Sequence, residues 1–91
     1  KNGIIKYISI DTYFHPDTDK ECFQILDFFT QRLSDHYHTT PKKRDTISYY
    51  DGNWYVDRIP ICNNYICAVS LHILGYNGCE VSVVFYDPNR N

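Results

Sequence analysis

The chain has 91 residues, of which 43% are hydrophobic and 22% charged, and its formal net charge is −2. This composition is typical of one small globular domain over residues 1–91, and it excludes a disordered chain and a protein that holds nucleic acid or anionic lipid by charge alone. No apolar run approaches the about 20 residues of a membrane-spanning helix, so we expect no membrane partner.

A first strand is expected at residues 3–14. Apolar and polar positions alternate there with the period of two that places successive side chains on opposite faces of a sheet. Pro16 ends the strand, because proline cannot donate a backbone hydrogen bond to a neighbouring strand. One face carries Ile4, Ile8, Ile10, Thr12 and Phe14, and the other carries Ile5, Tyr7, Ser9, Asp11 and Tyr13.

A single helix is expected after Thr18. Thr18 and Glu21 have the spacing of a capping box, in which each side chain binds the backbone N–H of the other residue. Apolar residues then recur at the i, i+3, i+4, i+7 spacing of one helical face, and the pattern frays at residues 37–40. The apolar face holds Cys22, Ile25, Leu26, Phe29 and Leu33, and the opposite face holds Gln24, Asp27, Gln31, Ser34 and Asp35.

A β-hairpin is predicted between Asp45 and Ile59. Asp51 and Gly52 form a two-residue turn in this prediction, which pairs Tyr49 with Trp54. The apolar residues then share one face, which we assign to the core. That face holds Ile47, Tyr49, Trp54 and Val56, and the other face holds Ser48, Tyr50 and Tyr55.

A second hairpin is predicted from Tyr65 to Tyr86. A three-residue loop at 76–78 keeps the apolar faces of its two arms in phase, and both Gly52 and Gly78 are expected at positive φ. Residues 88–91 follow as a frayed tail. The shared apolar face holds Tyr65, Cys67, Val69, Leu71 and Ile73 from the first arm, and Cys79, Val81, Val83 and Phe85 from the second.

The order of these elements, one strand, one helix and then four strands, predicts an α+β fold. We expect an antiparallel sheet of about five strands with the helix packed on one face. The expected contacts of the helix on the sheet are Ile8, Ile10, Val56, Val69, Leu71, Val81 and Val83.

The four cysteines allow three pairings in a protein with two disulfides. Cys22, Cys67 and Cys79 lie on predicted apolar faces, where free thiols pack as small hydrophobic groups. We therefore expect reduced cysteines and an intracellular location, cytoplasmic or nuclear.

No catalytic, cofactor or metal site is predicted. His36, His38, Cys62 and Cys67 are the residue types of a zinc site, but the tight Cys-x2-Cys spacing is absent. Cys62 is the one thiol on a predicted loop, and the sequence places no histidine beside it. We expect a protein that is not an enzyme.

The face of the sheet that the helix leaves open is predicted to be rich in tyrosine and serine, a mixture favoured in binding surfaces. A solvated face with stabilising cross-strand pairs is the simpler alternative. We expect a protein-interaction or regulatory module that binds a protein partner, or a second copy as a homodimer, through this face or a strand edge. Candidate partner-binding residues are Tyr7, Tyr13, Tyr50, Tyr55, Tyr86 and His72.

The alternative function is a small nucleic-acid-binding domain. Lys42, Lys43 and Arg44 form a basic loop that could neutralise phosphates while nearby tyrosines stack on bases. Nine basic residues against eleven acidic ones favour a solvated loop instead.

Overall fold

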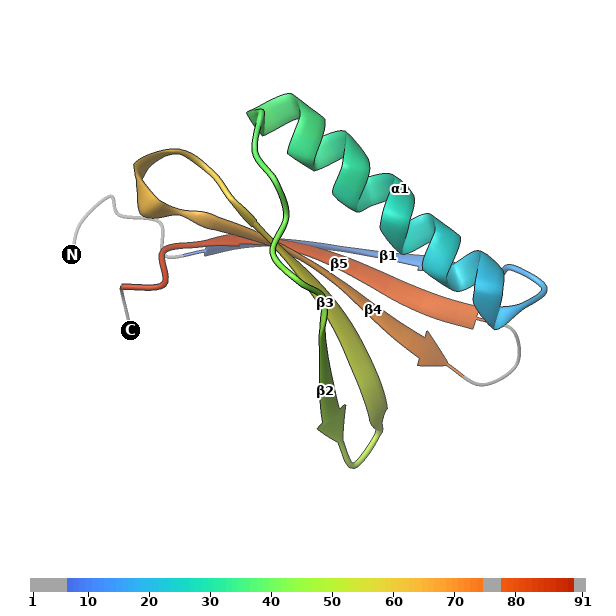
Figure 1. The fold of residues 1–91 in the computed structure, drawn as a ribbon. Coiled ribbons are helices and arrows are strands. Elements are labelled where there is room, and N and C mark those ends of the chain that lie inside the picture. Colours follow the sequence, from blue (N-terminus) through green and yellow to red (C-terminus); the bar gives the residue numbers. More distant parts are fainter. Residues whose placement is uncertain (1–6, 75–77, 90–91) are drawn as a thin grey trace.

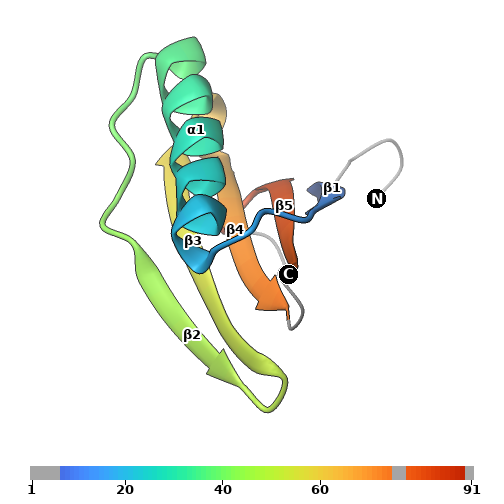
Figure 2. The same cartoon turned by 90° about the vertical axis from the view of Figure 1, so that its right-hand side faces the viewer.

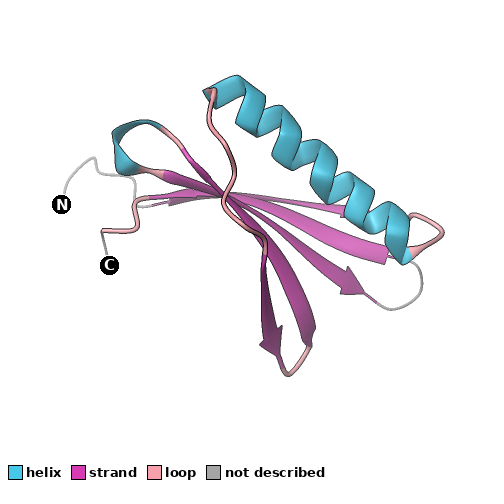
Figure 3. Cartoon of the chain, viewed as in Figure 1, coloured by secondary structure: helices cyan, strands magenta, loops and turns pink. Residues whose placement is uncertain are grey.

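The computed structural model describes residues 7–74 and 78–89. One antiparallel sheet of five strands carries a single α-helix on one face, which confirms the predicted α+β fold (Figures 1 and 3). The strands follow the order β1-β5-β4-β3-β2, so β1 and β2 are the two edges. The elements are β1 (Tyr7–Phe14), α1 (Asp19–Tyr37), β2 (Asp45–Tyr49), β3 (Gly52–Pro60), a 3-10 turn (Cys62–Asn64), β4 (Ile66–Leu74) and β5 (Gly78–Tyr86).

The ends of α1 are set by local hydrogen bonds. Glu21 donates its backbone N–H to Thr18 Oγ1 over 3.2 Å, and Thr18 donates its own to Glu21 Oε1 over 3.1 Å, which confirms the capping box. At the other end His38 takes a left-handed conformation, and its backbone N–H donates to the carbonyls of Asp35 and Ser34. Both ends therefore satisfy backbone groups that a helix alone leaves unpaired.

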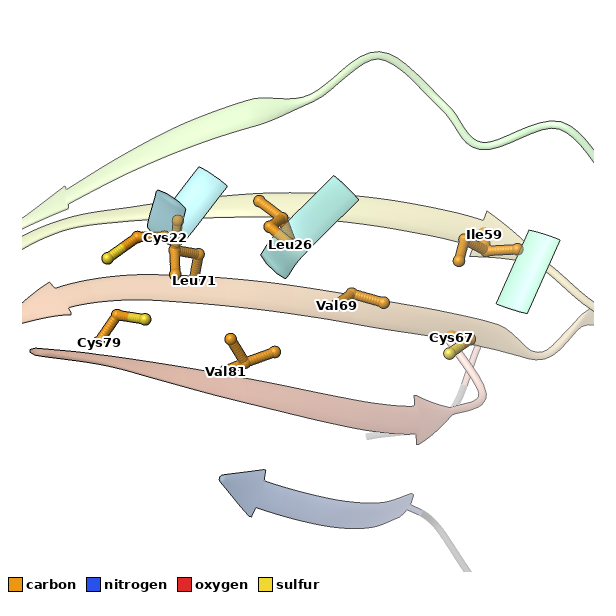
Figure 4. Packing of buried hydrophobic residues seen from close by; sticks show 8 residues of the cluster. All are labelled: Cys22, Leu26, Ile59, Cys67, Val69, Leu71, Cys79 and Val81. Atoms are coloured by element: carbon orange, nitrogen blue, oxygen red, sulfur yellow. The ribbon is translucent and has the colours of Figure 1, made fainter. Parts of the chain in front are cut away.

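The core lies between α1 and the middle of the sheet. The helix packs mainly on β4 and less on β3 and β5. Of the described residues, those of β1 and β2 contribute none to the fully buried cluster (Figure 4). This cluster consists of Cys22, Leu26, Ile59, Cys67, Val69, Leu71, Cys79 and Val81.

The predicted packing of α1 is confirmed for the central strands of the sheet and wrong for the edge strand β1. Val69, Leu71 and Val81 are buried under the helix, as expected. Ile8 and Ile10 are about half exposed, because α1 packs mainly on β4 and its aromatic contact with β1 is at Phe14, at the end of the strand. The buried stripe of α1 also includes Thr30 and Ser34 beside Cys22 and Leu26.

The buried cysteines are packing groups. All four cysteines are free, and Cys22, Cys67 and Cys79 are buried, as their apolar positions predicted. Burial raises the pKa of the Cys67 thiol to about 11. Burial, with the neighbouring Cys22 as a smaller cause, raises the pKa of Cys79 to about 12. These thiols therefore stay protonated at neutral pH and are poor nucleophiles.

The hairpin of β2 and β3 differs from its prediction by two residues. Tyr49 pairs with Gly52 and Ile47 with Trp54, so Tyr50 and Asp51 form the turn. A shift of two residues keeps every side chain on its own face, so the agreement of the faces could not reveal the error. Gly52 has the expected positive φ, 121°, but as the first residue of β3.

The same hairpin presents the opposite face to the helix from the one predicted. Tyr55 contacts Phe23 of α1 edge-on, with ring centroids 4.7 Å apart, and Ile59 is fully buried in the core. Because faces alternate along a strand, Trp54 and Val56 lie on the face away from α1. The predicted contact of Val56 with the helix is therefore wrong.

The hairpin of β4 and β5 has the predicted faces. Ile73 pairs with Cys79 and Leu71 with Val81, on the helix side. Leu74 pairs with Gly78, which makes Gly78 a strand residue, so the connecting segment is 75–77 instead of the expected 76–78. That segment lies outside the described residues, but Gly78 itself is described. It belongs to the extended strand β5 and does not have the expected positive φ, so that prediction is wrong.

Candidate functional site

The face of the sheet opposite α1 is covered by no helix within the described ranges, and we call it the open face (Figure 2). Its chemistry changes from one edge to the other. Near β1 it carries Ser9, Asp11 and Ser82, in agreement with the predicted polar surface. Near β2 and β3 it carries Ile47, Tyr49, Trp54 and Val56, which the prediction had assigned to the core.

A hollow of about 250 Å³ lies in the apolar half of the open face, and we call it the open-face hollow. Val56 and Ala68 lie beneath it. They are buried because larger neighbouring side chains shield them, although no helix among the described residues covers this face. Tyr49 forms part of the wall and is 57% exposed. The lining residues are Ile47, Tyr49, Trp54, Val56, Arg58, Ala68, Ser70, Val84 and Tyr86.

His72 supports one wall of this hollow. Its ring stacks on that of Trp54, with centroids 4.4 Å apart and an interplanar angle of 16°. Its Nε2 lies 3.0 Å from the backbone carbonyl of Asp51, and a carbonyl only accepts, so Nε2 carries the hydrogen and donates it. The pair of contacts joins the turn between β2 and β3 to β4.

Gly52 is required by this arrangement for two reasons. Its φ of 121° lies in a region that side chains rarely adopt, and a Cβ there would lie 3.3 Å from His72 Nε2. We expect Gly52→Ala to lower the free energy of unfolding by about 1–3 kcal/mol, measured by urea titration. Asp51→Ala keeps the carbonyl that His72 binds and should cost about 0.5 kcal/mol or less. Equal losses in the two variants would contradict the role of Gly52.

A second wall is held by Arg58, whose Nη1 donates to the Asp45 carboxylate. Burial lowers the pKa of Arg58, but hydrogen bonds with Asp45 and Tyr86 raise it above its ordinary value overall. Arg58 therefore stays charged and remains paired with Asp45. Because Asp45 pairs this charge within the wall, the remaining lining of the hollow is uncharged and mainly apolar.

The residues predicted to bind a partner are only partly gathered here. Tyr86 lines the open-face hollow, and His72 supports it from behind Trp54. Tyr13 is on the open face but lies on β1, at the far edge from β2. Tyr50 is fully exposed in the turn and does not line the hollow.

Two further predicted residues stand apart. Tyr55 packs against Phe23 on the helix side, so its assignment to the open face is wrong. Tyr7 pairs with Tyr86 through the backbone, but its side chain lies outside the described structure. Tyr49 and Trp54 were missed as open-face residues. Ile59 could have revealed their position. Tyr55 lies on the same face of β3 as the apolar Ile59, so Trp54 lies on the opposite face.

The basic loop is tied to acidic residues by a cluster that we call the Asp57 latch. Arg44 donates from Nε and Nη2 to the two carboxylate oxygens of Asp57, each over 2.7 Å, and Nη2 also reaches Asp27 Oδ1 at 2.6 Å. Thr30 Oγ1 donates to Asp57 Oδ2 over 2.7 Å. The hydrogen bond with Asp57 raises the pKa of Arg44 above its ordinary value, against desolvation, which lowers it.

The Asp57 latch argues against the hypothesis that the basic loop binds nucleic acid. Arg44 is bound to two carboxylates and cannot also grip a phosphate without releasing them. Lys42 donates its backbone N–H to the Arg58 carbonyl over 2.8 Å, which places the loop against β3. Its side chain borders a cleft lined by Asp27 and Asp57, two acidic residues that repel phosphate. Only Lys43 of the three predicted basic residues stays clear of this cluster.

The residues considered for zinc do not converge. Cys67 is fully buried in the core, whereas Cys62 is exposed in the 3-10 turn. His36 is exposed at the end of α1, with its ring edge-on to that of Tyr37. Over residues 7–74 and 78–89 there is no group of three or more His, Cys, Asp or Glu side chains that could hold a metal ion.

The chain was compared with protein families, curated proteins and solved structures. No family model, curated protein or solved structure matches the chain. Within the described part of the chain, no helix is long and apolar enough to cross a membrane. A function can therefore be inferred only from the surfaces described above.

Proposed function

We propose that the chain is a non-catalytic protein-interaction module that binds a protein partner through the open-face hollow. The observation that carries this proposal is a concave apolar surface, walled by the exposed Tyr49, on a sheet face that no helix of the described residues covers. Exposed aromatic residues around an apolar centre are typical of binding hot spots. The polar half of the open face then supplies the hydrated rim that such interfaces have.

The size of the hollow favours a protein partner over a small molecule. Its volume of about 250 Å³ is below the about 300–1,000 Å³ of most ligand pockets. One large apolar side chain, offered by a partner surface, fits this space. The neutral lining predicts that the inserted side chain is uncharged, because a charged one would lose its water without gaining a counter-ion.

Site-specific photo-crosslinking tests where a partner binds. A photoreactive phenylalanine analogue replaces Tyr49 in one bait and Gln31, which is exposed on α1, in a control bait. Both baits are irradiated in a lysate of the cells from which the chain comes. We expect a protein adduct at position 49 that is absent at position 31. Adducts of equal yield at both positions, or no adduct at either, would reject the proposal.

Two neighbouring tyrosines then give a matched measurement on the captured partner. Tyr49→Ala should weaken binding by about fivefold or more, which corresponds to about 1 kcal/mol, because it removes a wall of the hollow. Tyr50→Ala should leave the affinity unchanged, since Tyr50 does not line the hollow. Calorimetric titration of both variants measures this difference, and an equal loss in both would contradict the site.

A further inference from the structure

One helix covers only part of the helix side of this sheet. Figure 2 shows α1 over β3 and β4, with β5 and β1 extending beyond it. The inner face of β1 consequently has a bare region at Ile8 and Ile10, which are 49% and 56% exposed, whereas Phe14 at the end of the strand packs against Phe29 of α1. Phe28, on the flank of α1 that faces this bare region, is 58% exposed. This surface is on the opposite side of the sheet from the open-face hollow.

The bare region forms a continuous groove along α1. Two adjoining hollows of about 460 and 450 Å³ share Phe28 and Phe29, and together they follow the flank of the helix. Ile10 and Val83 line the first hollow, and Phe14 lines the second. The lining follows α1 from Glu21 to Leu33, so the groove is about 18 Å long, which is the length of a helix of about 12 residues.

The distance between the strands leaves a position, which we call the seat, for a second helix in this groove. Packed helices lie about 8–10 Å apart, and two strand spacings measure about 9.6 Å. Since α1 lies mainly on β4, the next helix would lie two strands further, on β1. Ile8 and Ile10 are the apolar residues that it would cover.

A second copy of the chain does not fill this seat. The outward face of α1 is polar, so it cannot cover Ile8 and Ile10; it carries Lys20, Gln24, Asp27, Gln31 and Asp35. Pairing of two β1 edges would instead leave the two α1 axes five strand spacings apart, about 24 Å, with the groove still open. The occupant must therefore bring an apolar helical face of its own.

Charged residues at the rim of the groove indicate which charges the bound helix carries. Arg32 lines the first hollow, and its guanidinium carbon lies 5.8 Å from the Phe28 ring centroid. Arg32 makes no ion pair with any described residue. Glu21 lines the second hollow, eleven residues earlier on α1, which corresponds to about 16 Å along the helix. The groove is thus apolar, with a positive and a negative group at its two ends.

We propose that this groove binds an amphipathic α-helix of a partner protein. Its apolar stripe lies on Ile8, Ile10 and Phe28, and a carboxylate of the helix faces Arg32. A basic residue about three turns away faces Glu21, which sets the direction in which the helix lies. This is the helix-in-groove mode of recognition, with anchors at i, i+3, i+4 and i+7.

A library of 18-residue helical peptides, which are longer than the groove so that their ends can project beyond it, is randomised at the stripe and flank positions and selected on the intact chain. We expect enriched peptides with an apolar stripe and an acidic residue three turns from a basic one. Their affinity should fall at least tenfold for Ile10→Glu and for Phe28→Glu. Both replaced side chains are more than half exposed, so the urea midpoints of the variants should remain close to that of the parent chain.

Charge reversal tests the orientation. Arg32→Glu should weaken the selected peptides about fivefold, and replacing the peptide carboxylate by lysine should restore the affinity. The proposal is overturned if no peptide is enriched, or if the enriched peptides bind Ile10→Glu and Phe28→Glu as tightly as the parent. It is also overturned if binding depends on Tyr49, which lies on the other face, or if the chain forms a dimer that Ile10→Glu dissociates.

Discussion

Replacing Asp57 by asparagine is expected to lower the free energy of unfolding by about 3–5 kcal/mol. The Asp57 carboxylate is 5% exposed and accepts hydrogen bonds from Arg44 Nε, Arg44 Nη2 and Thr30 Oγ1. An asparagine removes the negative charge and turns one acceptor into a donor, so the Arg44 guanidinium loses its buried partner and keeps only the exposed Asp27. Urea unfolding measures the loss, which approaches the whole stability of a small domain.

Two variants separate the buried pair from surface charge. Asp27→Asn alters a carboxylate that is 64% exposed, so it should cost about 1 kcal/mol or less. Arg44→Met combined with Asp57→Leu removes both charges and should recover most of the loss, because it leaves no unpaired charge. A double variant less stable than Asp57→Asn, or a large loss in Asp27→Asn, would show that the latch works in another way.

The latch also explains how the open-face hollow is held. The segment between α1 and β2 crosses from the helix layer to the sheet edge (Figure 1). Asp57 on β3, which also accepts a hydrogen bond from Thr30 of α1, fixes Arg44 directly before β2 begins. Ile47 and Tyr49 of β2 form part of the hollow, so loosening the latch should loosen that wall as well.

Local patterns were sufficient to predict the helix and the hairpin of β4 and β5. The capping box at Thr18 involves residues three apart, and it depends on no distant contact. The alternation in β4 and β5 spans nine residues in each strand, and it leaves one apolar face to bury. Both signals agree with the tertiary packing, which is why they could be read directly from the sequence.

The hairpin of β2 and β3 was mispredicted because each of its faces is apolar at a different end. Trp54 and Val56 make one face apolar near the turn, and Ile59 makes the other apolar far from it. Asp57 decides which face packs against α1, because its buried carboxylate needs the hydrogen bonds that Thr30 and Arg44 donate. These partners are 27 and 13 residues away, so no local pattern could reveal them.

The candidate site was therefore found in part. His72 and Tyr86 were placed on the open face correctly, because β4 and β5 alternate regularly. Tyr49 and Trp54 were missed with their hairpin, and Tyr55 was included by the same error. The groove beside β1 was hidden for another reason. Ile8 and Ile10 look like core residues, and only the position of α1 shows that they are bare.

Leu26→Ala should lower the free energy of unfolding by about 2–5 kcal/mol, whereas Phe28→Ala should lower it by about 1 kcal/mol or less. Leu26 is fully buried between α1 and the sheet, so its loss leaves a cavity in the core (Figure 4). Phe28 is two residues along the same helix, but more than half of its surface is exposed. Urea titrations of the two variants compare them directly. A loss in Phe28→Ala as large as that in Leu26→Ala would mean that Phe28 belongs to the core, and the groove beside β1 would then lack the exposed aromatic wall on which helix binding depends.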